Sequence, residues 1–266
     1  MARIVMKFGG AALSTLELIK EAAIKIKKKL KSYDEIIIVA SAMGSMTDDL
    51  LELAKKMNPN PPKREQDMLL TAGERISMSL LSIALDQLGI NGVSLTGSQS
   101  GIITTDDHSN AYIIDVRPIR IPNLLKENGV VVVAGFQGVS EKKEITTLGR
   151  GGSDTTAIAL GVALNAEKVE FYKDVEGFYT DDPKIDSLAT LIEHLNYDEA
   201  LELIKLSGRY VVHPRAIELA KKNGIPVHIL PYQKESLAKK GKGSWIIDSA
   251  FRPPSRAVYE KEFAFS

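Results

Sequence analysis

Two glycine-rich segments carry residue types that can hold a polyphosphate. The first, residues 7–10, reads Lys-Phe-Gly-Gly and follows a strand-like run at residues 3–6. The second, residues 150–154, reads Arg-Gly-Gly-Ser-Asp and opens an apolar, helix-like run at residues 155–164. Adjacent glycines let backbone N–H groups approach an anion, and a helix N-terminus adds a positive dipole. Glycine before a helix is also ordinary turn chemistry. A phosphate site is favoured because both segments occur in one chain, each with a fixed cation.

Lys7 is the first candidate for catalysis. An ammonium group beside paired glycines can neutralise charge on a transferring phosphoryl group, and positioning and electrostatics supply most of the catalysis in that reaction. The alternative is a surface lysine at the end of a strand, and the paired glycines favour the catalytic interpretation.

A second candidate segment, residues 173–184, follows another strand-like run. One interpretation is a nucleotide-binding loop, with Asp174 inside it, Tyr179 against the base or ribose and Lys184 near phosphate. The other is a turn cluster rich in Asp, Gly and Pro. The residues alone leave both interpretations open.

Composition excludes several classes of function. The 266 residues suffice for one large core or for two lobes that share a crevice. Lys plus Arg equals Asp plus Glu, at 34 each, with no basic stripe among aromatics, so we expect no nucleic-acid partner. The absence of cysteine excludes disulfides and thiolate chemistry, and the four scattered histidines show no zinc spacing. Without an apolar run of about 18–20 residues or a signal-peptide pattern, we expect a soluble, cytoplasmic protein that binds no membrane.

Short apolar runs alternate with amphipathic ones along the chain. Buried strands are predicted at residues 35–40, 130–134, 168–172 and 225–230, and helices at residues 16–31, 68–88 and 192–206. This alternation predicts an α/β fold with a mostly parallel sheet and helices on both faces. Such sheets bind ligands at the carboxyl ends of their strands, where the candidate residues fall. No repeat or interdomain linker is visible, and residues 251–266 are expected to form an edge segment or tail.

A series of motifs resembles the aspartate kinases of the amino-acid kinase fold. Their segments lie in the family's order over about residues 3–247, at residues 7–10, 39–47, 71–74, 95–97, 101–104, 135–138, 146–154, 174–184 and 212–215. The resemblance implies one domain with a three-layer αβα sandwich, in which about residues 1–155 hold the amino acid and about residues 156–250 hold ATP. It also suggests a homodimer.

The resemblance also assigns roles by position. Lys7 and Asp154 would be catalytic, with Asp154 orienting lysines or magnesium-bound water. The amino-acid substrate would be surrounded by Ser41, Thr47, Glu74, Phe136, Thr147 and Arg150. The nucleotide would be bound by Gly9, Gly10, Gly151, Gly152, Ser153, Lys173, Asp174, Tyr179, Lys184 and Tyr210. Mg²⁺ would arrive on the ATP phosphates, with no dedicated protein site.

The chain departs from the family pattern at three places. Ala11 and Ala12 stand where the family usually has Thr-Ser, which removes two hydroxyls near the phosphates. Tyr210 replaces a common lysine, and Arg209 or Lys173 is a possible substitute for that cation. The chain stops where regulatory domains begin in most of the family, so we expect no feedback inhibition through such domains.

The leading functional prediction is ATP-dependent phosphorylation of the side-chain carboxylate of L-aspartate, giving 4-phospho-L-aspartate and ADP. An aspartate side chain titrates near ~4, so no general base is needed. Glu74 can pair with the α-ammonium, and the Arg150 guanidinium matches a carboxylate. One alternative is a homoserine kinase or another amino-acid kinase on the same fold, for which Asp154 is the candidate base. Another is a catalytically silent nucleotide or amino-acid sensor.

Overall fold

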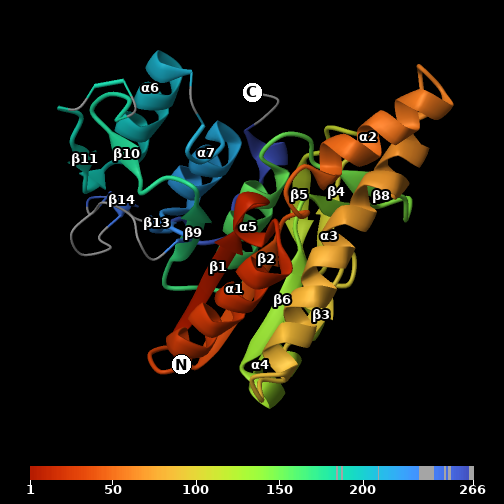
Figure 1. The fold of residues 1–266 in the computed structure, drawn as a ribbon, viewed down its shortest axis with the longest axis horizontal. Helices are drawn as coiled ribbons and strands as arrows, with labels where there is room; N and C mark the ends of the chain where they lie inside the picture. The colour runs from red at the N-terminus through yellow and green to blue at the C-terminus, as the bar shows by residue number, and fades with distance from the viewer. Residues whose placement is uncertain are drawn as a thin grey trace.

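A long, mostly parallel β-sheet forms the centre of the computed structural model (Figure 1). The described residues are 1–183, 185–186, 188–208, 210–233, 243–248, 250 and 253–263. In spatial order the sheet contains β12 (His194–Leu195), β14 (Ser244–Ile246), β13 (Val227–Pro231), β9 (Val169–Lys173), β1 (Arg3–Phe8), β2 (Glu35–Ala40), β6 (Val130–Ala134) and β3 (Val93–Leu95). Each neighbouring pair is parallel except β13 and β14.

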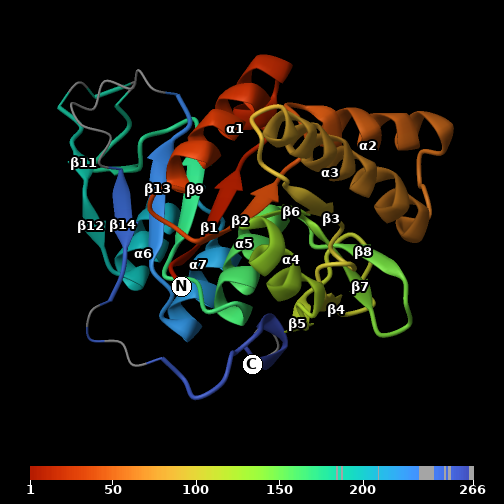
Figure 2. The same cartoon turned by 90° about the horizontal axis from the view of Figure 1, so that it is seen from below.

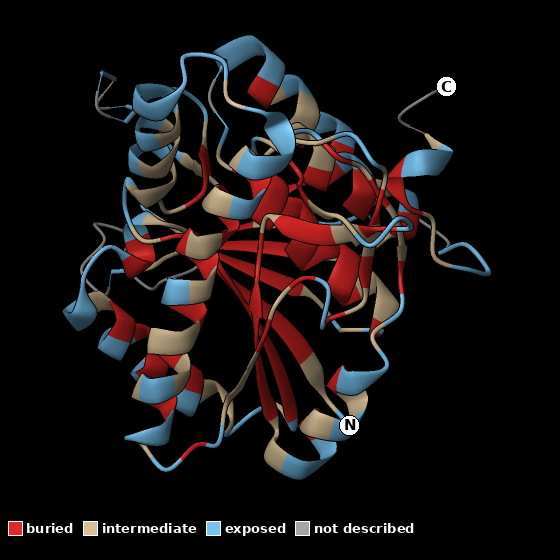
Figure 3. Ribbon diagram, turned by 90° about the vertical axis from the view of Figure 1, so that its right-hand side faces the viewer, coloured by how far each residue is buried: buried red, intermediate tan, exposed pale blue. Residues whose placement is uncertain are grey.

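Helices cover both faces of this sheet (Figure 2). One face carries α1 (Leu16–Lys29) and α3 (Lys63–Asp86), with α2 (Met46–Met57) packed on α3. The other face carries α4 (Arg120–Asn128), α5 (Gly152–Ala163), α6 (Tyr197–Ser207) and α7 (Pro214–Asn223). Side chains alternate across a strand. Ile4 and Met6 of β1 therefore pack into the core between the sheet and α1 and α3, while Val5 packs into the core on the opposite face. The predicted αβα sandwich is confirmed, and Figure 3 shows its central strands deeply buried.

The predicted elements agree with the structure where the apolar runs are long. Residues 35–40 and 130–134 form β2 and β6 with the predicted bounds. The helix predicted at residues 192–206 is wrong over its first residues, which belong to β11 (Leu191–Ile192) and β12. Asn196 starts α6 there, because its side chain accepts the N–H of Glu199 and the Glu199 carboxylate accepts that of Asn196.

A second sheet of four short strands was not predicted. It contains β5 (Ile113–Val116), β4 (Ile102–Thr104), β7 (Gln137–Ser140) and β8 (Ile145–Thr147). Strands of three or four residues are too short to show a period in the sequence. A hairpin of β10 (Phe178–Tyr179) and β11 completes the sheets described.

Residues 253–263 pack against the body of the protein. Tyr259 and Glu260 are buried, and Glu260 begins the 3₁₀ turn η2 (Glu260–Glu262). The Asn223 side chain at the end of α7 binds both the N–H and the carbonyl of Val258, each at 2.9 Å. The segment is therefore an integral part of the fold rather than a loose tail.

Helix α3 is long and apolar enough to cross a membrane by length and composition alone. Half of its most apolar window is buried inside the protein, which is typical of a core helix.

Candidate active site

Two lysines and one carboxylate meet at the carboxyl ends of two central strands. Lys7 lies in β1 and Lys173 ends the neighbouring strand β9. Asp154 lies in the first turn of α5, with Oδ1 2.7 Å from the Lys7 Nζ. Its two oxygens also lie 3.2 and 3.1 Å from the Lys173 Nζ, and Oδ2 accepts the His213 N–H at 3.2 Å. The carboxylate therefore fixes both ammonium groups at the edge of the sheet where ligands bind in such folds.

Burial and mutual charge set the ionisation of this cluster. Burial lowers the pKa of Lys7 to about 8, aided by Lys173 and opposed by Asp154. Burial alone would raise the pKa of Asp154, but the charges and hydrogen bonds of Lys173 and Lys7 outweigh it and hold that pKa well below its usual range. Near neutral pH the cluster thus holds two cations and one anion.

The glycines before α5 allow a close approach between two chain segments. Gly151 caps the helix with φ of +74°, a conformation that favours glycine. A Cβ at this position would lie 2.1 Å from the His213 ring. Gly152 and the buried Ser153 follow in the first turn, where helix N–H groups lack intrahelical partners. The segment therefore presents backbone N–H groups that can bind an anion, with His213 packed against Gly151.

The first glycine pair is arranged differently from the expectation. No α-helix begins directly after Gly10, because a 3₁₀ turn, η1 (Ala11–Leu13), precedes α1. The N–H of Gly9 lies 3.4 Å from the Tyr172 carbonyl and continues the contact between β1 and β9. A Cβ on Gly10 would lie 3.0 Å from the Ala42 carbonyl oxygen, so this glycine lets the loop after β2 come close.

Glu74 of α3 is a buried carboxylate with one free oxygen. Its Oε1 accepts the Ala42 N–H at 3.2 Å, and its Oε2 has no hydrogen-bond partner among the described residues. Burial raises its pKa to about 7, while the Ala42 N–H and the Lys7 charge oppose the rise. An oxygen of this kind can accept a hydrogen bond from an ammonium group of a ligand.

Other residues predicted to bind the amino acid lie in the segments that follow β2 and β6 and in the segment that precedes α5. Ser41 directly follows β2 and Thr47 lies in the first turn of α2, both half-buried. Phe136 follows β6 with an unusual φ of +68°, and its ring lies beside Gly152. Arg150 is exposed between Gly149 and Gly151.

Thr147 is already engaged by a residue that the sequence did not single out. Its hydroxyl donates to Asp67 Oδ1 at 2.6 Å, and its N–H donates to Oδ2 at 3.1 Å. The fully buried Asp67 also accepts from the Ser109 N–H and contacts His108 Nδ1 at 2.8 Å. Asp67 lies on the buried face of α3. A carboxylate on the apolar face of this helix is the one feature of the sequence that could have pointed to this residue.

The remaining residues predicted to bind nucleotide are spread along the chain after β9. Asp174 is exposed next to Lys173. Tyr179 in β10 donates to Glu176 Oε2 at 2.7 Å, and burial together with that carboxylate raises the pKa of Tyr179 to about 12. Tyr210 is 63% exposed, with its ring 5.4 Å from that of His213. Lys184 and Arg209 lie outside the described residues.

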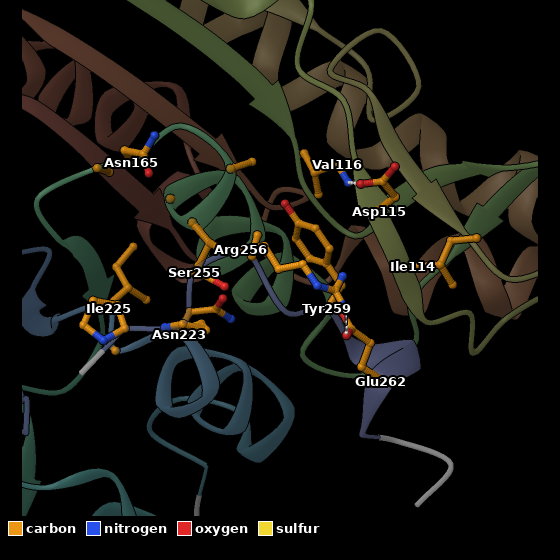
Figure 4. A pocket seen from close by; sticks show the side chains of 18 of the residues that line it. Ile114, Asp115, Val116, Asn165, Asn223, Ile225, Ser255, Arg256, Tyr259 and Glu262 are labelled. Carbon is orange, nitrogen blue, oxygen red and sulfur yellow. Dashed lines mark hydrogen bonds and ion pairs between the residues drawn. The ribbon is translucent and has the colours of Figure 1, made fainter. Parts of the chain in front are cut away.

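The described residues contain no group of three or more His, Asp or Glu side chains that could hold a metal ion. Two described cavities lie elsewhere. One, of about 790 Å³, is lined by residues at the ends of α5 and α7, in β5 and in the segment 253–262 (Figure 4). The other, of about 580 Å³, is lined by Lys63, Asp106, Asp107, His108, Asn110 and Tyr112. None of the predicted site residues lines either cavity.

Comparison with known proteins identifies similar sequences and folds. The model of the amino acid kinase family matches residues 2–231. The aspartokinase of Corynebacterium glutamicum is 48% identical over 230 residues, which are 86% of this chain and 54% of that protein. The chain therefore spans about half the length of the curated relatives it matches.

Two solved structures have a similar fold. Aspartate kinase from Synechocystis superposes with a TM-score of 0.82 at 42% identity, over 96% of this chain and 40% of that one. Aspartokinase III of E. coli, solved with aspartate and ADP, gives a TM-score of 0.79 at 24% identity, over 94% of this chain and 66% of that one. The second likeness concerns the fold alone.

Proposed function

The chain belongs to the amino acid kinase family, and from this premise we propose that it transfers the γ-phosphoryl group of ATP to the side-chain carboxylate of L-aspartate. The products are 4-phospho-L-aspartate and ADP. The observation that carries the proposal is the buried cluster of Lys7, Asp154 and Lys173 at the strand ends. The names of the relatives support aspartate as the acceptor.

The cluster suits phosphoryl transfer because it offers fixed positive charge. Lys7 and Lys173 stabilise negative charge on the phosphoryl oxygens, while Asp154 holds both ammonium groups in place before the nucleotide binds. The backbone of Gly151, Gly152 and Ser153 binds the phosphates at the start of α5. Mg²⁺ bound to the ATP phosphates would supply further neutralisation of phosphate charge, whereas the Asp154 carboxylate is engaged by Lys7 and Lys173.

The two charged groups on the α-carbon of the amino acid are each bound by a side chain of opposite charge. The free Oε2 of Glu74 accepts the α-ammonium, and the exposed Arg150 guanidinium binds the α-carboxylate. Ser41, Thr47 and Phe136 border the substrate, and Thr147 contributes through the backbone that Asp67 fixes. From the family resemblance we also propose that about residues 1–155 hold the amino acid and about residues 156–250 the nucleotide, with Asp174, Tyr179 and Tyr210 on the nucleotide side.

A carboxylate acceptor fits this site better than a hydroxyl acceptor. Homoserine requires a base to remove its proton. Asp154 is a poor base, because Lys7 and Lys173 hold its pKa well below the usual range. The side chain of aspartate is already ionised at neutral pH and needs no base.

The test follows ADP release with aspartate and with homoserine, each with and without hydroxylamine. Acyl phosphates react with hydroxylamine to give a hydroxamate, whereas phosphate esters do not. We expect ADP release with aspartate but not with homoserine, and formation of the hydroxamate when hydroxylamine is added to the aspartate reaction. Turnover with homoserine and none with aspartate would refute the proposal, and nucleotide binding without turnover would favour a sensor.

The assembly of the protein is proposed from the family resemblance, and its location from the pattern of apolar residues in the sequence. We propose a homodimer in the cytoplasm, acting on small molecules only. Light scattering after gel filtration tests the dimer. A mass near 29.1 kDa, that of one chain, would show a monomer instead.

A further inference from the structure

A buried ion pair links residues 253–263 to α7. Glu260 is 1% exposed, and its Oε1 accepts from Nε of Arg215 at 2.8 Å. Its Oε2 accepts the N–H of Ile113 in β5 at 2.8 Å. Both carboxylate oxygens are thus satisfied, as a buried charge requires. The sequence gives no sign of this role, because Glu260 belongs to an ordinary charged Glu-Lys-Glu run.

The other end of Arg215 reaches the backbone beside the candidate phosphate segment. Its Nη1 donates to the Leu148 carbonyl at 2.5 Å, and its Nη2 donates to the Ala111 carbonyl at 2.9 Å. Leu148 immediately precedes residues 149–152, which we call the glycine loop. The planar guanidinium therefore joins Glu260 on one side to the first residue before the glycine loop on the other.

Arg215 adds to the hydrogen bonds that hold the glycine loop. The Leu148 N–H donates to the Phe136 carbonyl at 2.9 Å, and the Gly152 N–H donates to the Gly149 carbonyl at 3.0 Å, so the Leu148 carbonyl is the group that Arg215 fixes. Gly149 and Gly151 both have positive φ, at +70° and +74°, and glycine restricts its own backbone weakly. The loop leads directly into Asp154, which holds Lys7 and Lys173. A small displacement at Leu148 would be passed along the loop to this cluster.

We propose that Glu260 is a positioning residue of the active site. It holds Arg215 in the orientation that fixes the Leu148 carbonyl, and so it sets the place of the glycine loop and of Asp154. The catalytic meaning of this role rests on the proposed phosphotransfer. Contact with substrate is not part of the role.

The structure provides variants that separate positioning from simple stabilisation. Asn223 binds Val258 independently, so the segment keeps a second attachment when Glu260 changes. Glu260→Gln keeps the shape and one acceptor oxygen but removes the charge. Glu262→Gln is the matched control, because Glu262 lies in the same turn and is exposed. The change removes its surface ion pair with Arg256, while a glutamine oxygen can still accept the Tyr259 N–H that Glu262 Oε1 accepts at 3.3 Å.

The experiment combines steady-state kinetics with hydrogen exchange of a peptide covering residues 145–153. For Glu260→Gln we expect kcat to fall about 10- to 100-fold, the range that a misplacement near 1 Å produces. The peptide should exchange faster, while Glu262→Gln behaves as the wild type. Arg215→Lys should give the same defects, since a lysine ammonium lacks the planar array of donors that reaches Glu260 and both carbonyls, and the double variant should be little worse than either single one.

Two results would overturn the proposal. One is unchanged kinetics and unchanged exchange in Glu260→Gln. The other is a loss of activity that matches the loss of folded protein, with normal kcat per folded molecule and normal exchange of the loop. If the wild type shows no turnover, the proposed function fails, whereas the exchange of the loop in Glu260→Gln still decides whether Glu260 fixes it.

Discussion

The ammonium nitrogen of Lys7 lies 2.7 Å from Oδ1 of Asp154, and the same carboxylate also binds Lys173. Two cations thus share one anion in a buried place. A buried carboxylate with a single cation would be neutral as a pair, but this group carries one surplus positive charge when all three side chains are ionised. That surplus makes it suitable for binding a polyanion.

Removal of Lys7 should abolish most of the activity while leaving the fold intact. In Lys7→Ala, Asp154 keeps Lys173 as a partner, so no isolated buried charge remains. We expect kcat to fall at least ~100-fold, the scale of losing one transition-state donor. Lys20→Ala, at an exposed position of α1, is the control. Near-normal turnover would remove Lys7 from the mechanism.

The pH dependence of kcat/KM for aspartate should be bell-shaped. Glu74, with a pKa of about 7, must be ionised to pair with the α-ammonium, so the rate should fall below that pH. Lys7, with a pKa of about 8, must be protonated, so the rate should fall above that pH. Rates measured at low substrate report these values for the free enzyme. A flat profile, in which the rate falls neither at low nor at high pH, would contradict both assignments.

Glu74 should also make the protein less stable at high pH. Its folded pKa of about 7 lies above the ordinary value of 4.5, so the folded state prefers the protonated form. The stabilising contribution is full below about pH 4.5 and is lost as the pH rises through 7. The loss amounts to roughly 3 kcal/mol. Urea unfolding should therefore find Glu74→Gln more stable than the wild type at pH 8 but not at pH 4.5, and an equal effect of exposed Glu21→Gln would disprove this origin.

Arg150 should determine recognition of the α-carboxylate. In Arg150→Ala we expect KM for aspartate to rise about 10- to 100-fold, as for a lost hydrogen bond to a charged group. The sharper test uses 3-aminopropanoate, which lacks the α-carboxylate. The wild type should prefer aspartate strongly and the variant should lose most of that preference, whereas an undiminished preference would assign the carboxylate to another residue. Exposed Arg120→Ala serves as the control.

Gly151 should tolerate no side chain. Gly151→Ala places a Cβ 2.1 Å from the His213 ring at a φ of +74°. We expect a loss of about 1–2 kcal/mol from the backbone conformation and a further 1–3 kcal/mol from overpacking. Gly89→Ala is the matched control, since Gly89 has a φ of +75° and open space around its Cβ. Equal urea midpoints for the two variants would show that the contact with His213 is unimportant.

The layers of the fold followed from the sequence because its central strands are continuous apolar runs. β2 and β6 are buried on both faces, so their residues show no competing pattern. The four-stranded second sheet has strands as short as Ile102–Thr104, whose pairing depends on distant segments. Such pairing leaves no local sign in the sequence.

The candidate site was predictable only where it is local in sequence. The glycines and Asp154 lie within one segment, and Lys7 stands beside its own glycines. Lys173 entered as one of two possible cations, and its contact with Asp154 arises because β9 lies next to β1. The contacts of Asp67 with Thr147 and of Glu260 with Arg215 join residues 80 and 45 positions apart, so spacing alone cannot reveal them.

The position of β1 between β2 and β9 also has a consequence for how the molecule matures. β1 gains its second neighbour only after more than 160 further residues have been added, because β9 begins at Val169. Pairing over so large a separation is slow to close. A chain still lacking β9 has no Lys173 beside Lys7, so the charge cluster of Lys7, Asp154 and Lys173 cannot be complete before β9 has been made.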